Sequence, residues 1–127
     1  MPFELFVNGT LMRGLKLNPN MGTSEFLGEF RTAPYYRAFT INDVHPGMFR
    51  VNDGESGGAS IWGELYMVDD ETWAKIEAGE PPNLYRGMIE LEDGRKVYGI
   101  LYPRELADGH YPEITQYGGW RAYWATK

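Results

Sequence analysis

The sequence predicts an α+β fold, a small mixed β-sheet or barrel with one or two helices packed on it. Short apolar runs of strand length alternate with polar turns along most of the chain, and only two segments have a helical pattern. Strands and helices do not follow the βαβ order of parallel sheets. The 16 glycines are about twice the usual share, which suits turn-rich β structure. The 127 residues are expected to form one domain, residues 1–127.

Strands are predicted where apolar residues gather between turn-forming residues. In the first part of the chain these segments are residues 3–8, 26–30, 36–41, 49–51 and 60–68. Residues 10–20 contain a glycine, a proline and two asparagines, and are predicted to form a loop or one short turn of helix. The His-Pro-Gly sequence at 45–47 predicts a turn, and residues 53–58 predict a polar, glycine-rich loop.

Residues 69–78 have the pattern of a helix. One of the two aspartates that begin it can cap the first turn, and a glycine followed by two prolines ends it. Trp73 and Ile76 are three residues apart and share a face. Glu80 lies four residues beyond Ile76, so it places a carboxylate where this face calls for an apolar side chain, unless the helix has already ended. The aromatic residues 118–124 predict a second, short helix that closes the chain.

A β-hairpin is predicted near residue 93. Residues 87–92 and 95–102 flank an Asp-Gly pair at 93–94, which is the favoured composition of a two-residue type I′ turn. A two-residue turn sets a register in which Tyr85 faces Tyr102 on the apolar face of the hairpin. Both phenols are then expected at its open end, close in sequence to Glu80.

Composition excludes several classes of function. The net charge of −6 and the absence of a lysine or arginine run argue against a nucleic-acid partner. The absence of cysteine excludes a disulfide scaffold, a thiol nucleophile and cysteine-ligated metal, and fits a cytoplasmic protein. No secretory signal is expected from the first residues, and no apolar run reaches the ~18 residues that span a membrane. His45 and His110 lack partners at ligand spacing and are interpreted as surface-loop residues, so neither a metal nor a cofactor is expected.

The first candidate site follows the strand at residues 3–8. Asn8, Gly9, Thr10 and Leu11 come directly after this apolar segment. A glycine at such a point lets backbone N–H groups face a ligand, and successive amides of this kind bind anions or carboxylates. An ordinary turn at the end of a strand accounts for the same residues.

The second candidate site centres on Glu80. It precedes two prolines, with Trp73 in the same helix and with Tyr85 and Tyr102 expected nearby. A carboxyl group among such side chains loses hydration, which raises its pKa and makes it a general base near neutral pH. The alternative is a solvated glutamate at the end of a helix.

These motifs resemble a known family. Residues 5–14, Leu-Phe-Val-Asn-Gly-Thr-Leu-Met-Arg-Gly, resemble the opening motif of the γ-glutamylcyclotransferase-like (AIG2-like) superfamily, an apolar strand followed by Tyr-Gly-Ser/Thr-Leu. Residues 63–72 are similar to its strand-into-helix segment, and residues 76–80 to its Leu-Asp-x-x-Glu ending. The resemblance implies that family's α+β barrel. It also implies a cofactor-free cyclisation that releases 5-oxoproline, with Glu80 at the position of the acid/base glutamate.

A second resemblance is more specific and narrows the family further. Residues 32–37, 46–51 and 114–123 are similar to the C-terminal domain of allophanate hydrolase, which shares the cyclotransferase-like fold. It implies decarboxylation of a small N-carboxylated carbamate in urea or amide catabolism. That branch usually carries Ala-His-Leu in the first loop and an apolar residue at the glutamate position. This chain has no histidine in that loop and has Glu80, and both departures favour cyclotransferase chemistry.

The leading hypothesis is therefore a small enzyme, a transferase or lyase, acting on a γ-glutamyl-type amide. Glu80 is its catalytic residue. The substrate-binding residues are expected to be Asn8, Gly9, Thr10, Leu11, Tyr85 and Tyr102. Arg37 or Arg121 either neutralises a substrate carboxylate or forms a structural ion pair.

Two alternatives accompany this hypothesis. The first is the decarboxylase-like accessory of urea or amide catabolism. The second is a non-catalytic module that partners an amidase or forms a homo-oligomer. In the second case Trp120 and Trp124 are interface anchors, whereas otherwise they close the core.

Overall fold

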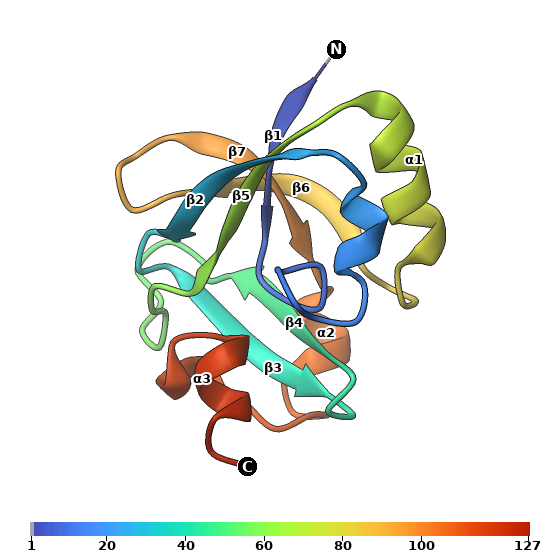
Figure 1. Ribbon diagram of the computed structural model, residues 1–127. Coiled ribbons are helices and arrows are strands. Elements are labelled where there is room, and N and C mark those ends of the chain that lie inside the picture. Colours follow the sequence, from blue (N-terminus) through green and yellow to red (C-terminus); the bar gives the residue numbers. More distant parts are fainter. Residues whose placement is uncertain (1) are drawn as a thin grey trace.

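The computed structural model describes residues 2–127 and contains one five-stranded sheet (Figure 1). Its strands lie in the order β2-β5-β1-β7-β6. Their bounds are β1 Phe3–Val7, β2 Glu25–Arg31, β5 Trp62–Val68, β6 Tyr85–Glu90 and β7 Lys96–Leu101. Strand β1 runs antiparallel to β5 but parallel to β7. The predicted mixed sheet is therefore confirmed.

A second sheet consists of the hairpin β3 (Tyr36–Ile41) and β4 (His45–Arg50). The prediction of a turn at 45–47 was wrong, because these residues form the first half of β4. The chain turns instead at Asn42 and Asp43, whose φ angles of 55° and 58° are those of a type I′ turn. Proline is tolerated within β4 because this strand is an edge of a two-stranded sheet.

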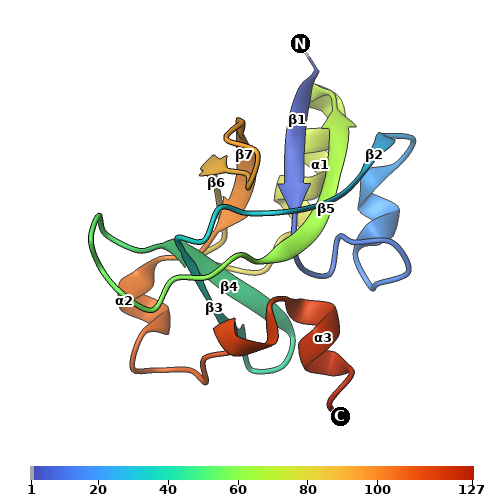
Figure 2. The same ribbon diagram turned by 90° about the vertical axis from the view of Figure 1, so that its left-hand side faces the viewer.

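The two sheets enclose the core, with the short hairpin lying across one end of the larger sheet (Figure 2). The edges of the larger sheet approach each other beyond β2 and β6, where Thr32 and Leu91 form a single bridge. The sheet therefore curls without forming a closed barrel, and the barrel part of the prediction does not hold, although the α+β class is confirmed. The largest fully buried side chains are Tyr36, Phe6, Phe39, Leu5, Met48, Ile61, Leu65, Ile76, Ile89, Leu91, Ile114 and Glu64.

The main helix, α1, spans Asp70–Gly79. Its N-cap is Asp69, whose carboxylate accepts a hydrogen bond of 2.7 Å from the backbone N–H of Thr72. Ile76 is its fully buried residue. The predicted helix at 69–78 is thus confirmed, ending one residue later than expected. The remaining helical segments are η1 Asn18–Met21, α2 Arg104–Ala107, η2 Thr115–Tyr117 and α3 Trp120–Trp124.

The β6–β7 hairpin is present, but its predicted register was wrong by one residue. Tyr85 pairs with Leu101 rather than with Tyr102. The Leu91 N–H donates to the Arg95 carbonyl at 2.8 Å, so the loop has three residues. Its last residue is a glycine with φ of 91°, the left-handed conformation that three-residue hairpin loops require. A one-residue slip exchanges the two faces of a strand, so the two tyrosines do not lie opposite each other.

Among residues 2–127 we find no helix that is both long enough and apolar enough to cross a bilayer.

Candidate functional site

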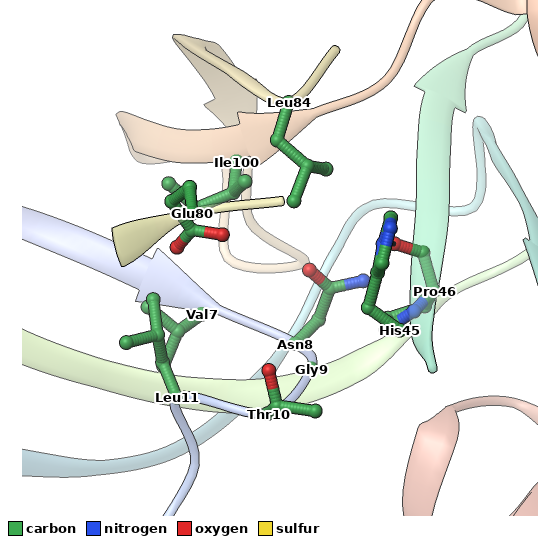
Figure 3. A pocket seen from close by; sticks show the side chains of 10 residues that line it. All are labelled: Val7, Asn8, Gly9, Thr10, Leu11, His45, Pro46, Glu80, Leu84 and Ile100. Carbon is green, nitrogen blue, oxygen red and sulfur yellow. Dashed lines mark hydrogen bonds between the residues drawn. The ribbon is translucent and has the colours of Figure 1, made fainter. Parts of the chain in front are cut away.

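A pocket opens where five chain segments meet (Figure 3). These are the end of β1 with the loop after it, the start of β4, the residue that follows α1, the residue before β6, and β7. Its volume is about 320 Å³ with the part open to solvent included. The lining residues are Val7, Asn8, Gly9, Thr10, Leu11, His45, Pro46, Glu80, Leu84 and Ile100. The structure therefore brings the two candidate sites, residues 8–11 and Glu80, together in one cavity.

Glu80 is the C-cap of α1, held by its own N–H, which donates to the Glu77 carbonyl at 3.3 Å. Its Oε1 atom is buried and has no hydrogen-bond partner among the described residues. Burial without a compensating partner raises the pKa of Glu80 to about 7. This carboxyl group is thus close to half-protonated at neutral pH, which is the condition for taking up and returning a proton.

The loop after β1 supplies hydrogen-bond donors. The backbone N–H groups of Gly9, Thr10 and Leu11 form no hydrogen bond with any part of the chain that the structure describes. Packing fixes the loop, since a Cβ at position 9 would lie 2.7 Å from Cδ of Pro46. Only glycine permits this approach to β4. The free amides suit a carboxylate or a carbonyl oxygen that gains negative charge.

Asn8 is 5% exposed and lies between this loop and β4. Its amide nitrogen donates to the sulfur of Met48 at 3.6 Å. That contact orients the side chain so that the amide oxygen is directed into the pocket (Figure 3). Asn8 therefore offers an acceptor to a ligand.

The structure separates the two tyrosines of the predicted site. Tyr102 is 3% exposed and packs against Gly47 of β4, outside the pocket lining. Tyr85 is 48% exposed and lines an adjoining pocket of about 480 Å³, which shares Glu80 and Leu84 with the first. Tyr85 thus lies near Glu80 on the outer side of the segment that follows α1. Both roles remain predictions.

Neither candidate arginine lines the pocket. The Arg37 guanidinium contacts Glu113 at 2.9 Å and Asp108 at 3.2 Å. Arg121 contacts the buried carboxylate of Glu64 at 3.2 Å. The structure therefore gives both arginines the ion-pair role. None of the described lining residues is a lysine or an arginine.

His45 is a pocket residue that the sequence analysis missed. It was interpreted as a surface-loop histidine, but it is 5% exposed and lines the pocket from the start of β4. The available signal was Asn42-Asp43, which has the composition of a tight hairpin turn and implies that the following residues begin a strand.

Comparison with known proteins decides the family. The model of the allophanate hydrolase C-terminal domain matches residues 3–125. The chain belongs to the allophanate hydrolase C-terminal domain family. The crystal structure of a uropathogenic E. coli-specific protein is 43% identical to this chain with a TM-score of 0.90, over 100% of this chain and 98% of that one.

Three further proteins extend the comparison to both groups named above. Kluyveromyces lactis allophanate hydrolase is 26% identical with a TM-score of 0.87, over 99% of this chain but 21% of that one. A Vibrio cholerae protein with the provisional name gamma-glutamylcyclotransferase is 33% identical over 92 residues, 71% of this chain and 74% of that protein. An AIG2-like protein of Mus musculus shares the fold at 22% identity, with a TM-score of 0.63 over 87% of this chain and 82% of that one. The expected resemblance to both groups is confirmed.

Proposed function

We propose that the protein is a cofactor-free enzyme that cyclises a γ-glutamyl-type amide to 5-oxoproline and a free amine. The observation that carries this proposal is the carboxyl of Glu80, which is buried without a partner beside the three free amides of residues 9–11. The likeness to the Vibrio cholerae relative supports the same chemistry. A buried acid with a pKa near neutrality in a pocket is typical of proton-transfer sites.

The proposed reaction needs one group that moves a proton twice. Ionised Glu80 takes one proton from the substrate α-ammonium group, and the amine nitrogen then attacks the γ-carbonyl carbon. Glu80 gives this proton to the departing amine nitrogen as the amide C–N bond breaks. It then takes the second proton from the new ring nitrogen and passes it to the released amine, which leaves as an ammonium ion. The amides of Gly9, Thr10 and Leu11 hold the carboxylate-bearing end of the substrate in place of a cationic side chain.

Substrate entry requires the pocket to widen. The space open to the centre of a water molecule is only about 20 Å³, enough for about one ordered water. Leu84 lies between this pocket and the adjoining one, since both are lined by it. Displacement of Leu84 therefore joins the two cavities beside Glu80 and opens a path from the side of Tyr85.

The test is Glu80→Gln, which preserves shape and removes the titrating group. We expect turnover of γ-glutamyl amides, measured as 5-oxoproline and amine by chromatography, to fall by about 10²-fold or more. The matched control is Glu77→Gln, which changes an exposed glutamate on the same helix. Unchanged turnover in Glu80→Gln would falsify the assignment.

A second candidate function rests on the match of the allophanate hydrolase C-terminal family to residues 3–125. It is the decarboxylation of an N-carboxylated carbamate, alone or beside an amidase. In Kluyveromyces lactis the related domain is one part of a larger chain, which supports an amidase partner. Release of carbon dioxide from such a carbamate, without turnover of any γ-glutamyl amide, selects this alternative. Size-exclusion chromatography with an amidase tests the association.

A further inference from the structure

His45 occupies the wall of the pocket formed by the second sheet. It opens β4 directly after the tight turn at Asn42 and Asp43. The next residue, Pro46, is the one against which Gly9 packs. The tight turn before His45 and the packing of Gly9 against the ring of Pro46 therefore hold His45 beside the loop at residues 8–11. Figure 3 shows it next to Asn8, across the pocket from Glu80.

One hydrogen bond fixes the protonation pattern of the His45 ring. Nδ1 lies 2.9 Å from the carbonyl oxygen of Pro46. A carbonyl can only accept, so Nδ1 carries the proton and Nε2 presents a lone pair. Burial lowers the pKa of His45, and the hydrogen bond with Pro46 opposes this only in part. The ring is thus neutral, with Nε2 as a pure acceptor.

The Nε2 atom has no protein partner in the part of the chain that the structure describes. The ring is otherwise enclosed, with Tyr102 at 6.1 Å between ring centroids. The residue is largely buried, but Nε2 keeps some accessible surface, so water or a ligand can supply its hydrogen bond. Among the described lining residues, Glu80 and His45 are the two that titrate. The mechanism above uses only Glu80.

We infer that Nε2 of His45 accepts a hydrogen bond from the attacking amino group of the substrate and orients its lone pair toward the γ-carbonyl. This inference rests on the proposed cyclisation, and adds to it a residue that binds the amine. An α-ammonium group has three N–H bonds. One proton goes to Glu80, a second N–H is held by His45, and the nitrogen lone pair freed by the transfer attacks the carbon.

Two substitutions separate this role from a structural one. His45→Asn keeps a donor near the Nδ1 position, so the bond with Pro46 is preserved while the acceptor is lost. His45→Gln keeps an acceptor near the Nε2 position and loses the donor. We expect kcat to fall by about 10- to 100-fold in His45→Asn with little change in Tm, and by less than tenfold in His45→Gln. His110→Asn, at an exposed histidine, is the matched control.

A modified substrate gives the deciding measurement. Methylation of the α-amine leaves two N–H bonds, one for Glu80 and one for His45, so in the wild type the methyl group must point away from both groups. In His45→Asn the methyl group can also take the place of the lost acceptor contact. We expect methylation to slow the wild-type enzyme more than His45→Asn. Equal sensitivity of both proteins to methylation, or wild-type kcat in His45→Asn, overturns the role of His45 alone. Absence of γ-glutamyl turnover in the wild type overturns the proposed function, and the role of His45 with it.

Discussion

Replacing Glu80 by glutamine has a predicted consequence for stability that is independent of any substrate. Glu80 is half-buried, and its Oε1 atom is buried without a hydrogen-bond partner in residues 2–127. Its pKa rises from 4.5 to about 7 on folding because burial penalises the charged form. Glutamine has nearly the same shape but never ionises. The substitution therefore removes a cost that the wild type bears whenever Glu80 is charged.

The sign and size of this cost follow from proton linkage. Between pH 4.5 and pH 7 the folded protein keeps the Glu80 proton while the unfolded chain has lost it. The free energy of unfolding therefore decreases as pH rises through this window. A shift of this size corresponds to about 3 kcal/mol as an upper limit. Above pH 7 both states are ionised, so the full loss persists at pH 8.

The assay is urea unfolding followed by tryptophan fluorescence at pH 5 and pH 8. At pH 5 we expect Glu80→Gln and the wild type to differ little. At pH 8 we expect Glu80→Gln to be more stable by up to about 3 kcal/mol, which corresponds to roughly 10 °C in Tm for a chain of this length. Glu77→Gln reports the effect of removing an exposed charge from the same helix. A Glu80→Gln variant that is less stable than the wild type at pH 8 refutes the reasoning.

Three further predictions concern the stability of the residues that surround the site or cap α1. Gly9→Ala places a Cβ 2.7 Å from Pro46, so we expect a loss of about 1–3 kcal/mol in urea unfolding and slower turnover. Asp69→Ala removes the N-cap acceptor of α1 and is expected to cost about 1 kcal/mol, measured in the same way. Glu64→Gln removes a buried, hydrogen-bonded charge and is expected to cost about 3 kcal/mol at pH 7. Because the pKa of Glu64 is lowered by its donors, a difference that stays constant as pH falls below 4 contradicts this account.

Elements governed by local chemistry were predictable from the sequence. The β3 strand matches its predicted bounds, and α1 follows its aspartate cap and its apolar face. The Asp-Gly pair at 93–94 identified the hairpin but not its register, because it is compatible with both a two-residue and a three-residue loop. The observed register pairs Ile89 with Val97, and both side chains are buried. Packing against the rest of the sheet, which no local pattern contains, therefore decided the register.

The candidate site was predictable in part for the same reason. Glu80 and the loop at residues 8–11 each have a local signal, a break in a helical pattern and a glycine after an apolar strand. Their meeting in one pocket depends on how α1 packs beside β1, which the family resemblance implied and periodicity alone does not. His45 was missed because proline in a strand is tolerated only at an edge, and edge position is a property of the assembled sheet.

Two glutamates, the buried Glu64 and the half-buried Glu80, have opposite surroundings. Glu64 is 1% exposed, and accepts hydrogen bonds from the Arg13 N–H at 2.8 Å and the Tyr66 hydroxyl at 3.0 Å, with Arg121 at 3.2 Å. These donors outweigh burial and lower its pKa. Glu80 has no such donor in the described chain, and its pKa is raised.

An apolar residue at position 80 would continue the face of Ile76. Selection for stability alone would favour such a residue over glutamate. Retaining a charge-prone group there costs stability above neutral pH. The same fold satisfies Glu64 completely, so it is able to pair a buried carboxylate. We therefore interpret the unpaired Oε1 atom of Glu80 as a group that awaits a hydrogen-bond partner on a ligand that binds and dissociates. The partner that we propose is a substrate amine, held in a pocket with free amides at residues 9–11 and an acceptor at His45.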